Sequence, residues 1–156
     1  MLWAALKTLL NGNVRYVKIE NFLLDKTTNN MLLDSNIIII ASKLAQVKLI
    51  TYLWNNEKDL QTSIVTQIKV LGYHQLKQVE KTFLENFFNT IPIIPLNESI
   101  ATKAIELRQR KPIPLADAII AATALVYDLT LFTENVKDYA GIKGLKVVSI
   151  RDVIDE

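Results

Sequence analysis

From residue 31 onward, short apolar runs alternate with longer stretches in which apolar residues recur every three or four positions. Short runs of this kind are typical of buried strands, and the longer spacing is typical of amphipathic helices. We expect strands within 31–35, 91–95, 129–133 and 145–149, and a brief strand or turn at 60–65. Helices are expected over 36–55, with a break near Ser42, and over 66–71, 74–90, 97–110 and 116–128. This alternation predicts an α/β fold with a parallel sheet covered on both faces.

Two of the expected helices begin at polar residues that suit an N-cap. Thr66 is the candidate cap for the helix ending near Leu71, and Asn97 is the candidate for the helix over 97–110. An N-cap side chain accepts a hydrogen bond from a free backbone N–H in the first turn. The Phe-rich stripe at 83, 87 and 88 has helical spacing, which favours core or a dimer surface over a base-stacking platform.

The first 30 residues differ from the rest of the chain. A short amphipathic helix (1–10), a strand (14–24) and a polar linker (25–30) precede Met31, where a new apolar run begins. We interpret residues 1–30 as an N-terminal extension or upstream-start segment, and residues 31–156 as one domain of ordinary size.

Composition excludes several chemistries. The chain has no cysteine, one histidine and four glycines, so it carries no disulfide framework, Cys-rich zinc site, HExxH helix or glycine-rich phosphate loop. The net charge of +2 is compatible with a polyanionic partner without requiring one. No apolar run reaches the roughly 20 residues of a membrane helix, so we expect a cytoplasmic protein without a membrane partner. Carboxylates remain as the plausible catalytic groups.

Three acidic residues fall where an α/β fold collects its ligands. Asp34 ends the first predicted strand, Asp117 opens a helix, and Asp138 follows the strand at 129–133 together with Thr133 and Asn135. Two carboxylates about 4 Å apart repel by about 4 kcal/mol at an effective dielectric near 20, so they stay ionised together only around a cation. Oxygen ligands alone select Mg²⁺ or Mn²⁺. By spacing alone, each acid is also explained as a turn, helix-cap or solvated loop charge.

Four segments at these positions resemble, in order, the signature segments of PIN domains, most closely those of VapC-type toxins of toxin–antitoxin pairs. They are "MLLDSNIII", "TSIVTQIKVLGY", "PLADAIIAATAL" and "LFTENVKDYAGIKGLKVV". The resemblance implies a three-layer α/β/α fold and an acidic cluster that holds Mg²⁺ or Mn²⁺ for RNA cleavage. It implies Asp34 and Asp117 as metal ligands, with Asn36 helping to shape the site. For the last ligand it offers Thr133, Asn135 and Asp138. Many members carry Asp where this chain has Asn135, so Asp138 is the favoured charge, the Asn135 amide is the alternative ligand, and Thr133 and Asn135 otherwise support the site. The resemblance also implies a homodimer inhibited by a small antitoxin.

One position departs from the family pattern. Gln67 stands where the second segment usually carries Glu, and no acid occurs between Asp59 and Glu80 to replace it. A neutral amide oxygen can orient metal or water but carries no charge, and a lost charge-assisted contact costs about 1.5–3 kcal/mol. Either the remaining acids support a weakened endoribonuclease, or the chain is a catalytically degenerate PIN domain that binds RNA or an antitoxin. Cleavage of DNA or flap substrates is a third, less favoured alternative.

A basic segment precedes Asp117. Arg108, Arg110 and Lys111 lie at the end of a predicted helix and in the loop that follows it. These cations either complement the negative end of the helix dipole or contact substrate phosphates beside the acidic residues.

Overall fold

The computed structural model describes residues 30–43 and 45–154 of the 156-residue chain. The helix, the strand and nearly all of the linker expected before Met31 lie outside the described residues. Among the described helices, none alone is long and apolar enough to cross a membrane; only the pair α2 and α3, bent by 120°, reaches that length and hydropathy together.

Five short strands form one sheet in the order β3-β2-β1-β4-β5. Their bounds are β1 Met31–Leu33, β2 Leu60–Ser63, β3 Ile93–Ile94, β4 Thr130–Phe132 and β5 Val147–Val148. Every neighbouring pair is parallel. The predicted parallel sheet is therefore confirmed, with β1 at its centre.

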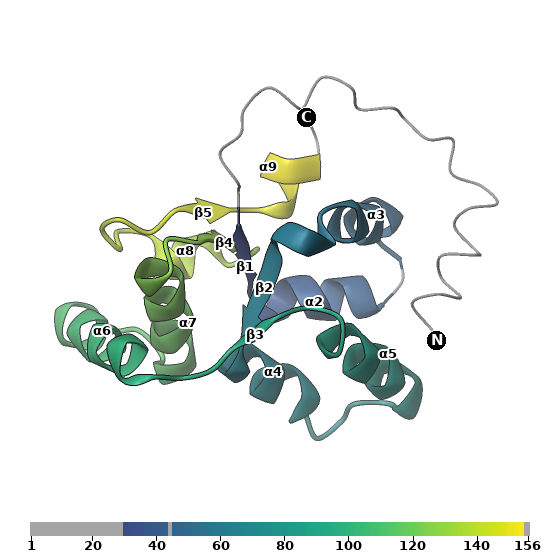
Figure 1. Ribbon diagram of the computed structural model, residues 1–156, viewed down its shortest axis with the longest axis horizontal. Coiled ribbons are helices and arrows are strands. Elements are labelled where there is room, and N and C mark those ends of the chain that lie inside the picture. Colours follow the sequence, from purple (N-terminus) through teal and green to yellow (C-terminus); the bar gives the residue numbers. More distant parts are fainter. Residues whose placement is uncertain (1–29, 44, 155–156) are drawn as a thin grey trace.

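Helices cover both faces of the sheet, which gives the expected three-layer α/β/α arrangement (Figure 1). Their bounds are α2 Ser35–Ser42, α3 Val47–Asn55, η1 (3₁₀) Glu57–Asp59, α4 Ile64–Leu71, α5 Gln78–Phe88, α6 Glu98–Arg110, α7 Leu115–Val126, α8 Val136–Tyr139 and α9 Ile150–Ile154. The break expected near Ser42 separates α2 from α3. The short helices η1, α8 and α9 were not predicted, because three to five residues are too few to show a helical period.

The core consists of two apolar layers, one on each face of the sheet. Side chains alternate along a strand, so Leu33 and Phe132 join the layer beneath α2, α3 and α5, and Leu32 and Leu131 join the layer beneath α6 and α7. All four of these strand side chains are completely buried. Burial on both faces explains why the strands read as continuous apolar runs in the sequence.

The start of α4 corrects one sequence prediction. Ser63, not Thr66, is the N-cap, because the Ser63 side chain accepts a hydrogen bond from the Thr66 backbone N–H at 3.0 Å. The helix begins as soon as β2 ends, its N-cap lies three residues earlier than predicted, and Thr66 is buried in its first turn. The Asn97 cap of α6 is confirmed by its bond from the Ile100 N–H at 2.9 Å.

Candidate active site

The register of the two central strands brings the first candidate residues together. Leu33 at the end of β1 pairs with Phe132 at the end of β4. Asp34 therefore follows β1 and Thr133 follows β4, and both lie at the carboxyl edge of the sheet. The Asp34 backbone N–H donates to the Phe132 carbonyl at 3.0 Å, which continues the ladder to the edge.

Asp34 is almost fully buried and its carboxylate is held by several donors. Oδ1 accepts from the Ser35 N–H at 2.6 Å and the Ser35 hydroxyl at 3.2 Å. Oδ2 accepts from the Thr133 hydroxyl at 2.8 Å, the Asn36 amide at 3.2 Å and the Tyr139 hydroxyl at 3.2 Å. These donors engage both oxygens of the carboxylate. They offset the cost of burying the charge and fix the orientation of Asp34.

The residues expected to support Asp34 form one network with it. The Asn36 side-chain N–H donates to the Thr133 hydroxyl at 2.9 Å, and the side-chain Oδ1 of Asn36 accepts from the Glu134 N–H at 3.1 Å. The Asn135 N–H also donates to the Thr133 hydroxyl, at 3.1 Å. The start of α2 and the loop after β4 are thus bonded to each other through polar side chains.

Asp117 meets a lysine. It lies in the first turn of α7, where free N–H groups favour a carboxylate. Its Oδ1 lies 3.0 Å from Nζ of Lys69 on α4, and the two side chains are 17% and 36% exposed. This ion pair neutralises the charge at the start of an otherwise apolar helix.

The remaining predicted catalytic residues lie on α4 and α8. Gln67 is half-buried on α4, two residues before Lys69, and Asp138 is exposed on α8. Burial raises the pKa of Tyr139 far above its usual range, and the charges of Asp34, Asp117 and Asp138 raise it further, together with the hydrogen bond to Asp34. Tyr139 therefore stays protonated and donates its hydrogen bond to Asp34.

The donor set suits a hard divalent cation. Within residues 30–43 and 45–154, no three His, Cys, Asp or Glu side chains are grouped closely enough to form a ready-made metal cage. Mg²⁺, however, keeps several waters and is commonly held by only one or two carboxylates together with substrate phosphates. The edge supplies carboxylate, amide and hydroxyl oxygens and no nitrogen or sulfur ligand, which is the chemistry that such a cation prefers.

The predicted basic residues are only partly available for substrate. Arg108 Nε donates to the Ile113 carbonyl at 3.3 Å, and Lys111 Nζ donates to the carbonyls of Asp138 and Ala140 at 3.0 and 2.7 Å. Lys111 therefore binds the end of α8 and not that of its own helix. Arg110 is exposed at the end of α6.

Three site residues were missed by the sequence analysis. Ser35 directly follows Asp34, so its hydroxyl could have been recognised from the sequence as a donor to that carboxylate. Nothing local in the sequence indicated the contacts of Tyr139 and Lys69, because these residues lie 105 and 48 positions from Asp34 and Asp117, respectively.

The chain is similar to known proteins over most of its length. The family model described as PIN domain matches residues 31–140. Ribonuclease VapC1 of Rickettsia felis is 30% identical over 131 residues, which span 77% of this chain and 96% of the relative. Ribonuclease VapC of Rickettsia bellii is 27% identical over 132 residues, with the same coverage of both chains.

Solved structures show the same fold. A toxin–antitoxin complex from Klebsiella pneumoniae contains a chain that is 32% identical, with a TM-score of 0.63 and coverage of 76% of this chain and 95% of that one. VapBC2 from Rickettsia felis, bound to a DNA fragment from its promoter, matches with a TM-score of 0.68 at 21% identity and covers 76% and 97% of the two chains. With its family model matched over most of its length, this chain belongs to the PIN domain family.

Proposed function

We propose that this chain is a metal-dependent endoribonuclease that acts in the cytoplasm as the toxin of a type II toxin–antitoxin pair. The relatives named Ribonuclease VapC and VapC1 align with this chain over almost their whole length, and a similar solved chain belongs to a toxin–antitoxin complex. These names support RNA as the substrate and a small antitoxin protein as the partner. A homodimer, as expected from the family resemblance, belongs to the same proposal.

The observation that carries the proposal is the buried carboxylate of Asp34 at the sheet edge, held in one orientation by the hydroxyls of Thr133 and Tyr139. In this proposal Asp34, Asp117 and Asp138 hold Mg²⁺ or Mn²⁺. A bound divalent ion polarises a phosphoryl oxygen and lowers the pKa of a bound water. Thr133 and Asn36 keep the Asp34 carboxylate in one orientation, so that little reorganisation is needed at the reacting phosphate.

Lys69 and Gln67 make this site different from a fully acidic one. The Lys69 ammonium already compensates the charge of Asp117, so a divalent ion has to compete with it for Oδ1. Gln67, in the same helix, offers a neutral oxygen that orients water or metal without adding charge. Both features weaken metal binding relative to a site that has Glu at position 67 and an Asp117 carboxylate without a lysine partner.

RNA cleavage with added Mn²⁺ tests the proposal. Asp34→Ala is expected to abolish cleavage, and Gln67→Glu is expected to raise it roughly ten- to a hundredfold, because a charge-assisted contact is worth about 1.5–3 kcal/mol. Gln78→Glu, at an exposed position on α5, is the matched control and should leave the rate unchanged. Cleavage that survives Asp34→Ala, or that needs no divalent metal, contradicts the assignment.

A second candidate function is a non-catalytic PIN domain that binds RNA or an antitoxin. The Lys69–Asp117 ion pair and Gln67 favour it, because together they reduce the negative charge that a metal needs. Absence of Mn²⁺-dependent cleavage in the wild type, together with cleavage by Gln67→Glu, decides for this alternative. Inhibition by a small protein encoded next to this gene tests the antitoxin, and sedimentation analysis tests the homodimer.

A further inference from the structure

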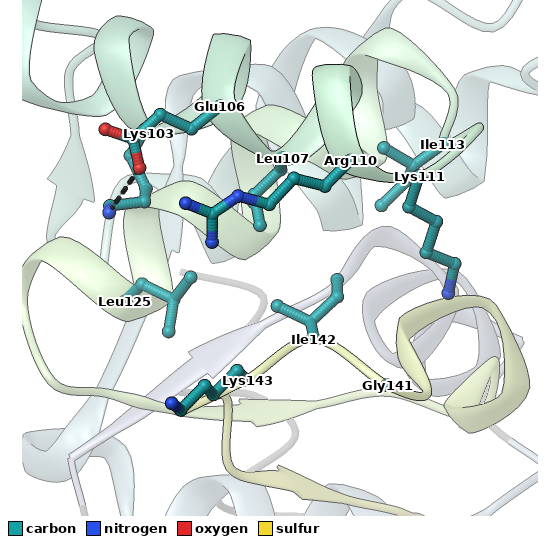
Figure 2. Close-up of a pocket in the computed structure, with 10 residues that line it drawn as sticks. All are labelled: Lys103, Glu106, Leu107, Arg110, Lys111, Ile113, Leu125, Gly141, Ile142 and Lys143. Atoms are coloured by element: carbon teal, nitrogen blue, oxygen red, sulfur yellow. Dashed lines mark hydrogen bonds and ion pairs between the residues drawn. The ribbon is translucent and has the colours of Figure 1, made fainter.

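A pocket of about 320 Å³ lies between α6, the end of α7 and the loop that joins α8 to β5 (Figure 2). Its apolar lining comes from these three segments and from the loop between α6 and α7, and consists of Leu107, Ile113, Leu125 and Ile142. Four cations, one carboxylate and a glycine complete the lining: Lys103, Arg110, Lys111, Lys143, Glu106 and Gly141. A volume near 300 Å³ is at the lower end of the range for small-ligand pockets.

Two of the cations remain available for a ligand. Lys103 is paired with Glu106 at 2.7 Å, and Lys111 binds the backbone carbonyls at the end of α8. Arg110 and Lys143 are exposed, and neither forms a hydrogen bond or an ion pair with any other residue in the described part of the chain. In Figure 2 the Arg110 guanidinium extends from α6 over the pocket, and Lys143 lies on the opposite wall.

The charge of this pocket is unusual for the chain. The whole sequence carries 18 basic and 16 acidic residues, with a net charge of +2. The pocket alone has four basic residues and one acidic residue, so positive charge is concentrated there. An anion is favoured in such a concave, partly apolar site, because the low-dielectric walls focus the field. The apolar lining additionally suits a ligand with a flat or aliphatic body.

The pocket adjoins the proposed active site through α8. Lys111 lines the pocket, and its ammonium group holds the carbonyl of Asp138, one of the three edge acids. Tyr139 of the same short helix binds Asp34, so α8 contacts both the acidic edge and the basic pocket.

We propose that this pocket binds one nucleotide of the RNA strand beside the cleavage point. Arg110 and Lys143 contact its phosphate, and the apolar residues pack against its sugar and base. The inference rests on the proposed ribonuclease function and adds a substrate subsite to it.

Binding of a labelled single-stranded RNA to the full chain, measured by fluorescence anisotropy in EDTA, separates binding from cleavage. The Arg110→Gln/Lys143→Gln variant is expected to bind about fivefold more weakly at 0.1 M salt, since one lost phosphate contact lowers the salt slope by about 0.7. Lys48→Gln/Lys58→Gln removes the same charge at exposed positions on α3 and η1 and should retain the wild-type slope. A pocket variant that matches this control overturns the proposal.

Competition identifies the ligand class. A nucleoside monophosphate should displace the RNA better than inorganic phosphate, because only the nucleotide uses the apolar lining. Equal competition by inorganic phosphate, or better competition by an acidic peptide, overturns the assignment to RNA. Cleavage is measured separately with Mn²⁺: if the wild type cleaves nothing while the pocket variant still loses affinity, the ribonuclease proposal fails and the RNA subsite stands.

Discussion

The Thr133 hydroxyl joins the two halves of the proposed site, and replacing it tests the network most directly. Its side chain is completely buried. It donates to Asp34 Oδ2 at 2.8 Å and accepts from the Asn36 amide at 2.9 Å and the Asn135 N–H at 3.1 Å. Thr133→Val puts a methyl group in place of the hydroxyl, so the shape is nearly kept while every one of these bonds is lost.

The expected loss follows from the kinds of bond removed. A hydrogen bond to a charged group contributes about 1.5–3 kcal/mol, and a neutral one about 0.5–1.5 kcal/mol. Water can replace Thr133 at Asn135, which is exposed, but not at Asp34, which is only 2% exposed. We therefore expect Thr133→Val to lower the free energy of unfolding by about 2–4 kcal/mol, a large part of the 5–15 kcal/mol of a typical domain.

Urea unfolding measures this loss, provided that the m-value stays unchanged. Thr123→Val is the matched control: Thr123 is 1% exposed, and its hydroxyl donates to the Ile119 carbonyl of its own helix at 2.7 Å, its only bond among the described residues. This control should lose about 1 kcal/mol or less. In the background of Asp34→Asn, Thr133→Val should cost less than in the wild type, since the charge is gone. Equal losses for Thr133→Val and Thr123→Val would refute the reasoning.

Three further predictions concern stability elsewhere in the chain. Ser63→Ala removes the N-cap that accepts from the Thr66 N–H and should cost about 1 kcal/mol in thermal unfolding, with Ser63→Thr retaining most of it. Gly144→Ala should cost about 1–2 kcal/mol in urea unfolding, because Gly144 has φ +84° and a side chain strains that conformation; an unchanged midpoint contradicts this. The backbone N–H and the hydroxyl of Ser149 lower the pKa of Asp152, so its contribution to stability is complete above the unfolded pKa and is lost as pH falls through the folded pKa. Asp152→Asn should therefore flatten the acid side of a melting-temperature series, and an identical acid profile argues against this role.

Much of the architecture was predictable from local pattern. Strands buried on both faces appear as uniform apolar runs, and amphipathic helices repeat every three to four residues, so both leave a signal within a short window. The Asn97 cap was readable for the same reason. The N-cap of α4 shows the limit of such local prediction, because Thr66 was predicted and Ser63 is the cap. Both residues carry a hydroxyl, and only the point at which β2 ends determines which of them caps α4.

Within the candidate site, the sequence predicted neighbours only for the residues that follow the strand ends. Asp34 and Thr133 directly follow strands that pair in register, so a parallel sheet already implies that they are neighbours. Position alone placed Asp117 at a helix start but gave no partner for it. The Lys69 ammonium comes from a different helix, and nothing local to either residue indicates the pair.

By itself, the sequence determined the order of strands and helices, the all-oxygen character of the available ligands and the neutral residue at position 67, because composition and periodicity are properties of the chain in one dimension. The tertiary structure decided which groups compensate each charge. It placed hydrogen-bond donors around Asp34, paired Lys69 with Asp117 and left Arg110 and Lys143 at the pocket without an ion-pair partner among the described residues. Electrostatic energy depends on separation in space and on burial, and both arise only when the packed helices and the sheet bring distant residues together.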